Sequence, residues 1–129
     1  MGFLRRRQAK SVDLEARSPE LGIKNKDLLV LKQLVDHGAD LTAPRHVLHY
    51  MYFSDDQAAR TAAAEITSPF SATITEAAVE SSAPMSKWLM LCEAHDYTLS
   101  PENVRTDTDF FEALASRCNG DYDGWEASV

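Results

Sequence analysis

The feature that most constrains the fold is an alternation of strand and helix patterns after residue 44. RHVLHYMYF, at residues 45–53, is rich in β-branched and aromatic residues and predicts a strand. FSATITE, at 70–76, alternates apolar with polar residues, and KWLMLCEA, at 87–94, is nearly all apolar. Both predict strands, and the second pattern is typical of a strand in the interior of a sheet. DYDGWE, at 121–126, is short and aromatic and predicts the last strand.

A helix is predicted ahead of the first strand. Asn25 can cap its start, and Gly38 ends it with His37 in the last turn. Apolar residues recur at helical spacing between these two signals, so we expect them to face the core. They are Leu28, Leu31, Leu34 and Val35.

Two further helices are predicted between the strands. Ser54 opens a capping box, SDDQ, and Pro69 ends the helix that follows. The stripe of small residues on this helix suits a helix that lies close against a sheet. Ser100 at the cap and Pro101 at the first helical position begin the second helix, which an Asn-Gly pair at 119–120 stops.

The order of these elements indicates the fold class. After the first helix, the chain gives strand, helix, strand, strand, helix, strand within about 85 residues. This order is typical of a ferredoxin-like two-layer sandwich, in which two helices pack on one face of a four-stranded sheet. We therefore predict an α+β fold of this type, βαββαβ, with an additional N-terminal helix.

Charge divides the chain into two parts. Residues 1–26 carry seven Lys or Arg and three acidic residues, whereas the remainder carries six and 17, a net charge of −11. The first part has no sustained hydrophobic period and is broken by Pro19 and Gly22. We predict a flexible basic arm over 1–25 and a single domain over 26–129. An acidic domain repels phosphate and attracts basic partners.

Several classes of function lack their sequence signals. No apolar run approaches the ~18 residues of a membrane span, and MGFLRRR is no signal-peptide core, so we expect a cytoplasmic protein. The sequence contains no glycine-rich phosphate loop, nucleophile elbow or zinc-protease motif. Cys92 and Cys118 lie in apolar patterns and are expected to be buried, reduced thiols. We predict that the protein is not an enzyme and needs no cofactor.

Two histidines, His46 and His49, are close together in the first predicted strand. Because residues three apart on a strand point to opposite faces, the pair is badly placed for joint metal binding. Asp55 and Asp56 resemble paired catalytic carboxylates, but their place at a helix start accounts for both. We therefore predict no metal site and no catalytic residues.

RNA binding is an alternative that the element order raises. RNA-recognition domains share this order and stack bases on aromatic residues of the open sheet face, where HYMYF would lie. Those domains surround the aromatic residues with Lys and Arg, whereas residues 27–129 have a net charge of −11. We therefore rank direct RNA binding by the domain below another alternative, recognition of a small ligand in a pocket between the sheet and the helices.

The stretch DYDGWE allows two interpretations. In one, Tyr122 and Trp125 pack on the core, Gly124 allows a bulge or turn, and the acids are solvated. In the other, the stretch is an exposed acidic edge whose rings and carboxylates hold an Arg-rich segment of a partner. The composition of the stretch leaves both interpretations open.

A combination of motifs resembles a known family. YDGWE follows a helix that ends in Asn-Gly, HYMYF lies early in the domain, and an apolar strand led by Trp88 lies between them. This combination resembles the ribonuclease E inhibitor family, regulator of ribonuclease activity B, over residues 26–129. The resemblance implies a small, acidic, cytoplasmic bacterial protein of ferredoxin-like fold that binds ribonuclease E, reduces its cleavage of RNA and is not an enzyme. Residues 122–125 are the only positions of this sequence that we match to the motif of the family.

We therefore predict a non-catalytic domain that inhibits or modulates a ribonuclease of the ribonuclease E type by binding a basic segment of it. A small-ligand-sensing module of the same fold is the alternative, followed by a direct RNA-binding domain. The predicted partner-binding residues come from the first and last strands. They are Tyr50, Tyr52, Asp121, Tyr122, Asp123, Gly124, Trp125 and Glu126.

Overall fold

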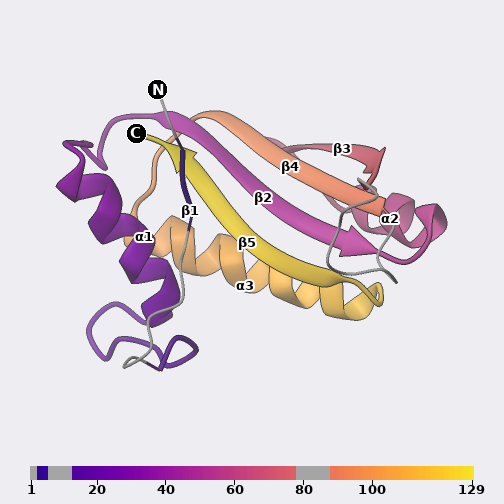
Figure 1. Ribbon diagram of the computed structural model, residues 1–129, viewed down its shortest axis with the longest axis horizontal. Coiled ribbons are helices and arrows are strands. Elements are labelled where there is room, and N and C mark those ends of the chain that lie inside the picture. The colour runs from indigo at the N-terminus through magenta and orange to yellow at the C-terminus, as the bar shows by residue number, and fades with distance from the viewer. Residues whose placement is uncertain (1–2, 6–12, 78–87) are drawn as a thin grey trace.

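The computed structural model describes residues 3–5, 13–77 and 88–129, and Figure 1 shows how their elements are arranged. Within these ranges, five strands form one sheet and three helices accompany it. In chain order the elements are β1 (Phe3–Arg5), α1 (Asn25–Asp36), β2 (Arg45–Phe53), α2 (Asp56–Ala63), β3 (Ser71–Glu76), β4 (Trp88–Tyr97), α3 (Pro101–Arg117) and β5 (Asp121–Ser128). None of the helices in the described ranges has the length and apolar character that a membrane crossing requires.

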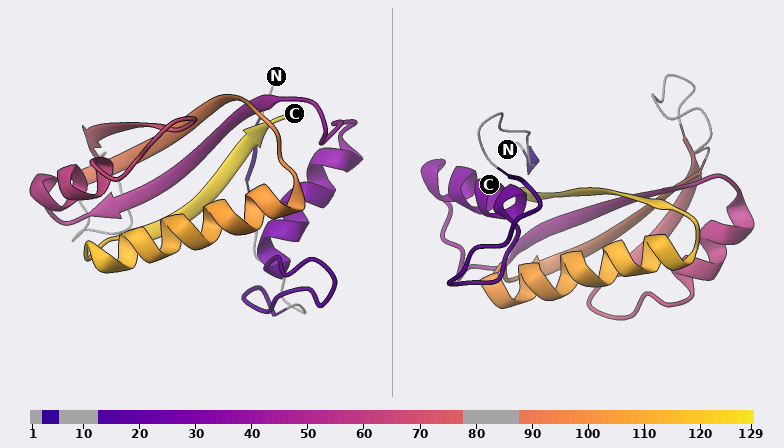
Figure 2. Two further views of the ribbon diagram at one scale, coloured as in Figure 1. Left: turned by 180° about the vertical axis from the view of Figure 1, so that it is seen from behind. Right: turned by 90° about the horizontal axis from the view of Figure 1, so that it is seen from below.

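The sheet has the strand order β1-β5-β2-β4-β3, and each pair of neighbours is antiparallel. From β2 onward the chain follows the order strand, helix, strand, strand, helix, strand. Helix α3 runs along one face of the sheet, while α1 and α2 lie toward its opposite ends (Figures 1 and 2). This arrangement confirms the predicted ferredoxin-like sandwich with an additional N-terminal helix.

Strand β2 shows which side chains face the helices. It has the predicted bounds, and its side chains alternate between buried and half-buried positions. Val47, Met51 and Phe53 are fully buried on the side that α2 and α3 cover, whereas Tyr50 and Tyr52 are half-buried on the opposite side. We call the helix-covered side the inner face of the sheet and the other side its outer face.

Side chains of the inner face and the helices form two apolar clusters. The first cluster includes Ile23, Val30, Leu31, Leu34, Val47, Leu99, Val104, Trp125 and Ala127. The second includes Met51, Phe53, Ala59, Ala62, Met90, Cys92, Phe111, Leu114 and Ala115. The fully buried Ala59 and Ala62 confirm that α2 packs through small residues. Burying a large apolar side chain of these clusters, such as a Leu, Val, Met or Phe, contributes about 1.5–3 kcal/mol to folding.

Helix α1 is rotated relative to the predicted stripe. Val35, which we expected in the core, is 51% exposed, and Leu28 is only partly buried. Lys24 occupies the cap position without a side-chain cap hydrogen bond, so the predicted cap at Asn25 is wrong. The buried residues are Asp27, Val30, Leu31 and Leu34. Since a buried acid has no place in an apolar pattern, hydrophobic spacing could not predict this rotation.

The other two helices begin at or next to the predicted residues. Ser100 caps α3 as predicted, and its Oγ accepts a backbone N–H at 3.1 Å. Helix α2 is capped one residue later than predicted, because Asp55 instead of Ser54 accepts the Ala58 N–H, at 2.7 Å. The SDDQ stretch thus starts a helix as predicted, but an aspartate provides the cap.

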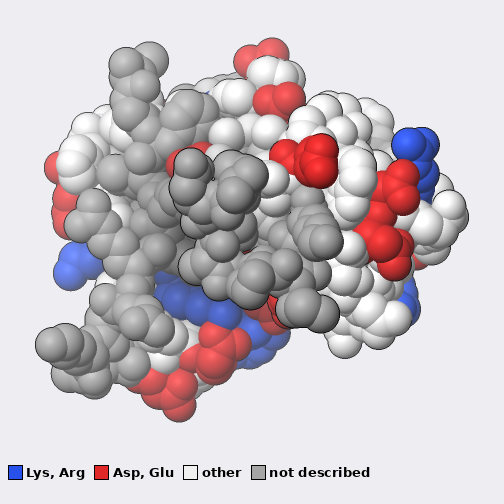
Figure 3. Space-filling model, turned by 45° about the vertical axis from the view of Figure 1, so that its right-hand side comes forward, with Lys and Arg blue, Asp and Glu red and all other residues white. Residues whose placement is uncertain are grey.

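Carboxylates are distributed over the surface in several places. Figure 3 shows separate patches of Asp and Glu, with Lys and Arg beside some of them. Arg60 pairs with Asp56 at 3.4 Å, and Arg117 pairs with Glu65 at 2.8 Å, in each case between exposed side chains. Exposed pairs contribute little to stability. The main consequence of the acidic composition is therefore the electrostatic potential around the protein.

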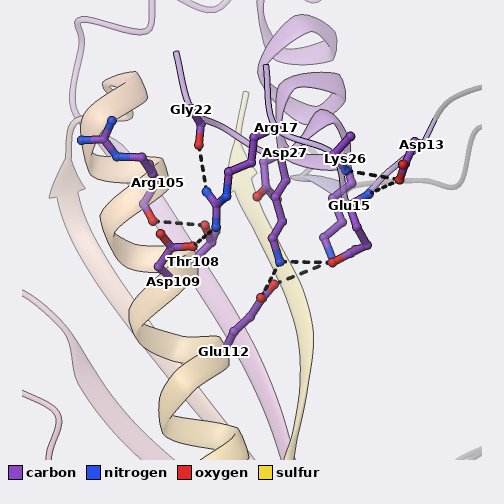
Figure 4. A network of polar contacts seen from close by, with 12 residues as sticks. Asp13, Glu15, Arg17, Gly22, Lys26, Asp27, Arg105, Thr108, Asp109 and Glu112 are labelled. Carbon is purple, nitrogen blue, oxygen red and sulfur yellow. Dashed lines mark hydrogen bonds and ion pairs between the residues drawn. The ribbon is translucent and has the colours of Figure 1, made fainter. Parts of the chain in front are cut away.

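Residues 13–24 contact α3 through a network of ion pairs, part of which Figure 4 shows. Arg17 pairs with Asp109 at 2.6 Å, and Lys24 pairs with Glu112 at 2.5 Å. Strand β1, which lies in the same predicted arm, pairs with β5. Parts of the predicted arm therefore contact the domain, β1 through strand pairing and residues 13–24 through ion pairs with acids of α3. The division into an arm and a domain stays a prediction.

Candidate protein-binding face of the sheet

The stretch DYDGWE forms most of β5, which lies between β1 and β2. Met51 pairs with Tyr122 and Tyr50 pairs with Gly124, so Asp123 is an extra residue on β5, a β-bulge. Gly124 has φ +101°, which residues with a side chain rarely adopt. The prediction of a last strand is confirmed. Within the described residues, β1 pairs only with residues 126–128 of β5, so residues 121–125 pair with β2 alone and carry the bulge.

The bulge determines where the two aromatic rings of the stretch point. In a regular strand, residues three apart face opposite sides, as Tyr122 and Trp125 would. The extra residue changes the alternation, so Tyr122 pairs with Met51 and Trp125 pairs with His49, both inner-face residues of β2. Both rings therefore lie on the inner face, in the clusters that the helices cover.

Trp125 is a core residue. Its side chain is 1% exposed and packs in the cluster that contains Val30 and Val104. Its indole N–H donates to the carboxylate of Asp27, which is fully buried in α1, at 2.9 Å. This hydrogen bond connects α1 to β5 and accounts for an acid at a core position. The prediction that Trp125 contacts a partner is therefore corrected, because the core covers its ring.

Tyr122 and His49 form a polar pair in the aromatic part of the core. The Tyr122 hydroxyl and His49 Nδ1 are 2.8 Å apart, and His49 is 2% exposed. The His49 ring lies 4.3 Å from the Phe111 ring and 5.5 Å from the Phe70 ring, between centroids. Tyr122 is half-buried, and its ring packs against the second apolar cluster.

The acidic residues of the stretch are placed differently from its aromatic rings. Asp121 pairs with Tyr52, and Glu126 pairs with another outer-face residue of β2, so both share the outer face. The Tyr50 hydroxyl donates to the Glu126 carboxylate on this face. Asp121 and Asp123 are exposed. Asp121 and Glu126 thus share one surface with the tyrosines of β2, and Asp123 is an exposed residue of the bulge.

Strand β4 extends the outer face beyond β2. Glu93 pairs with Leu48, and its Oε2 atom lies 2.6 Å from His46 Nε2. Leu89 and Leu91 pair with the two tyrosines of β2 and are half-buried. The described outer face therefore combines carboxylates, phenol rings and aliphatic side chains. Its members include Tyr50, Tyr52, Leu89, Leu91, Glu93, Asp121 and Glu126.

The cysteines offer little nucleophilic chemistry. Cys92 is buried, and burial raises the pKa of its thiol to about 12. The thiol therefore stays protonated at neutral pH, which makes it a poor nucleophile. Cys118 is half-buried instead of buried as predicted, and both thiols are free.

The histidines of β2 point to opposite faces, as predicted. His49 is buried on the inner face, and His46 is half-buried on the outer face. Strand β4 places His95 beside His46, with ring centroids 4.3 Å apart. This neighbour was not predicted, because His95 is far from His46 in sequence. The sequence shows only that Glu93 and His95 are two residues apart at the end of a predicted strand and so share a face; the pairing of that strand with β2 is a long-range contact.

A pocket of about 240 Å³ lies between the segment before β3, the end of β4, and α3. Phe70, Phe110 and Phe111 line it, together with Asp107, whose carboxylate accepts the Tyr97 hydroxyl at 2.6 Å. Burial raises the pKa of Asp107 to about 6, and burial also raises the pKa of Tyr97. The predicted small-ligand alternative would apply to this pocket.

Comparison with known families gives a match over most of the chain. The family model described as regulator of ribonuclease activity B matches residues 24–127. Comparison with curated proteins gives no match. The family match begins just before α1 and ends within β5, so it includes every described element except β1. Since it covers most of the sequence, the chain belongs to the regulator of ribonuclease activity B family.

Proposed function

We propose that this protein binds a ribonuclease of the ribonuclease E type through a basic segment of that enzyme, and so inhibits or modulates its cleavage of RNA. In this proposal the protein is not a catalyst and acts in the bacterial cytoplasm. The observation that carries the proposal is the match of residues 24–127 to a family of regulators of ribonuclease activity. The chemistry of the outer face supports the choice of a basic segment.

Charge favours a basic protein segment over RNA. Residues 27–129 have a net charge of −11, and Glu93, Asp121 and Glu126 lie on the outer face beside Tyr50 and Tyr52. Guanidinium groups pair with carboxylates and stack on tyrosine rings. The same carboxylates repel RNA phosphates. A segment rich in Arg therefore fits this surface better than a nucleic acid does.

The positions of the side chains narrow the predicted contact set. Tyr122 and Trp125 pack on the inner face, and Gly124 shapes the bulge and has no side chain for a contact. The remaining predicted residues are proposed to contact the partner. They are Tyr50, Tyr52, Asp121, Asp123 and Glu126.

A purified system tests the proposal. The full chain is mixed with a ribonuclease E-type enzyme and a labelled RNA substrate, and binding affinity and cleavage rate are measured over a range of salt concentrations. We expect binding and slower cleavage. A variant with Asp121→Asn, Asp123→Asn and Glu126→Gln should bind about tenfold more weakly and with a shallower salt dependence, since it loses charges that meet the basic segment.

A second triple variant controls for net charge. It carries Glu20→Gln, Asp36→Asn and Glu65→Gln, three exposed acids outside the sheet, and should bind like the unmodified protein. Equal weakening in both variants would assign the effect to total charge and remove the outer face from the proposal. Failure of the unmodified protein to bind the enzyme or change its cleavage rate would contradict ribonuclease regulation itself.

The pocket beside Tyr97 supports a second candidate function, recognition of a small ligand. Aromatic rings around a single half-buried carboxyl group are features of small-molecule sites. A fragment screen by NMR tests this candidate, with Phe110→Ala, at the pocket rim, as the control variant. Binding confined to the pocket and lost in the variant would favour it. Absence of such binding would leave ribonuclease regulation as the single candidate function.

A further inference from the structure

Two histidines and one glutamate lie together on the outer face, where β2 and β4 pair. His46 belongs to β2, and Glu93 and His95 are two residues apart in β4. Each offers one ligand atom, and these three atoms all lie within 4.8 Å of one another. Imidazole nitrogen and carboxylate oxygen are common ligands of zinc and related transition metals.

The distances are close to those of an assembled metal site. Glu93 Oε2 is 2.6 Å from His46 Nε2 and 3.7 Å from His95 Nε2. Zinc binds nitrogen and oxygen at about 2.0–2.2 Å, so neighbouring ligand atoms in a tetrahedral site are roughly 3.4 Å apart. An ion therefore needs His46 and Glu93 to separate by roughly 1 Å, which side-chain rotation can supply.

The strands place the two rings side by side, and one ring must rotate before both nitrogen lone pairs can point to one ion; the mostly exposed His95 side chain has room to do so. The rings of His46 and His95 stack with centroids 4.3 Å apart and planes 14° apart, and both Nε2 atoms lie near the same Glu93 oxygen. The β2–β4 register shifts next to His46, and Asp96, beside His95, has φ +54°. Such bulges re-aim side chains and are frequent beside functional sites.

The cluster is open to solvent on one side. The side chains of His46 and Glu93 are 30% and 28% exposed, and that of His95 is 69% exposed. An ion can therefore reach all three groups from solution, and water can complete its coordination. Three protein ligands plus an open position is the arrangement of exchangeable or catalytic zinc, whereas structural zinc usually has four protein ligands.

We propose that His46, Glu93 and His95 form a binding site for a divalent transition-metal ion, with Zn²⁺ as the best match. The site goes beyond the proposed function, which needs no metal. It departs from the prediction of no metal site, which rested on the opposite faces of His46 and His49 and on the buried cysteines. A bound Zn²⁺ adds positive charge to the outer face and so weakens its attraction for a basic segment.

Calorimetric titration of the untagged full chain with Zn²⁺, after treatment with a chelator, tests the site. We expect one Zn²⁺ per chain with an affinity of about 1 µM or tighter. His95→Ala changes a mostly exposed side chain, so the variant should fold normally and bind Zn²⁺ at least about tenfold more weakly. His46→Ala and Glu93→Gln should weaken binding to a similar degree.

Two control variants separate this site from other ligands. His37→Ala removes an exposed histidine at the end of α1, and Cys118→Ser removes the half-buried thiol, so both should bind Zn²⁺ normally. In NMR spectra, the ring signals of His46 and His95 should shift together on addition of Zn²⁺. No binding below about 100 µM, unchanged binding in His95→Ala, or loss of binding in either control would overturn the proposal.

Discussion

The two faces of β5 divide one short motif into side chains that pack in the core and side chains that lie on the outer face. On the inner face, Tyr122 and Trp125 lie in clusters covered by the helices. On the outer face, Asp121 and Glu126 lie beside the tyrosines of β2. A motif that is continuous in sequence thus contains two sets of residues in different positions, and only the outer set is proposed to contact a partner. The comparison teaches that a specific motif does not by itself identify contact residues, because packing alone can require aromatic residues and a glycine.

The largest expected effect on stability comes from removing an aromatic side chain from the inner face. Trp125→Ala removes a side chain that is 1% exposed and also removes the donor to Asp27. We expect a loss of about 3–5 kcal/mol in the free energy of unfolding, measured with urea. Tyr52→Ala, on the outer face, should cost roughly 1 kcal/mol or less. Similar losses in the two variants would break the distinction between the faces.

A smaller loss is expected from the residue that sets the bulge. Gly124→Ala places a side chain at φ +101°, which should cost about 1–2 kcal/mol in the free energy of unfolding. Gly38→Ala is the matched control, because Gly38 has φ +88° and nothing lies within 4 Å of an added Cβ. Both variants carry backbone strain, but only Gly124→Ala should change the NMR signals of Tyr122 and His49. Unchanged signals would show that the bulge does not orient these rings.

Much of the fold could be predicted from local patterns. The bounds of β2, the cap of α3 at Ser100 and the interior position of β4 all follow from residues close together in sequence. The outer-face position of Tyr50 and Tyr52 also follows from simple alternation along β2. These features needed no knowledge of distant contacts.

Features that depend on distant segments could not be predicted. Asp27 is buried because it accepts a hydrogen bond from Trp125, 98 residues away. His95 meets His46 only because β4 pairs with β2. A Cβ at Gly120 would lie 2.4 Å from the Phe53 ring, so this glycine is needed for a close approach that the sequence does not reveal. Local sequence patterns therefore predict the helices and strands. The residues of the candidate sites are brought together by contacts between distant elements.

A pH-dependent effect is expected from the pocket on the helix side of the sheet. Burial raises the pKa of Asp107 to about 6, whereas an unfolded Asp has a pKa of about 4. The folded state thus binds this proton more strongly, so the contribution stabilises below pH ~4 and is lost as pH rises to ~6. Asp107→Asn lacks this loss, so its stability relative to the unmodified protein should increase over that range.

Urea unfolding at several pH values between 4 and 7 measures this difference. Tyr97→Phe sharpens the test, because the Tyr97 hydrogen bond lowers the pKa of Asp107 and opposes the effect of burial. Its removal should extend the pH range over which stability falls to higher pH. An identical pH dependence in Asp107→Asn and the unmodified protein would show that the pocket carboxyl does not bind a proton more strongly in the folded state.

The smallest expected effect is on RNA. Of the basic residues in 1–26, Arg17, Lys24 and Lys26 pair with acids of the chain, and residues 27–129 have a net charge of −11. We therefore expect no micromolar binding of a structured RNA in a gel shift at about 0.15 M salt. Binding that disappears in Tyr52→Ala would show that the outer face stacks bases, as RNA-recognition domains do, and would move the proposed function from ribonuclease to RNA. Binding that persists in Tyr52→Ala but is lost with added salt would instead come from the basic N-terminal residues, and would leave the acidic outer face available for a protein partner.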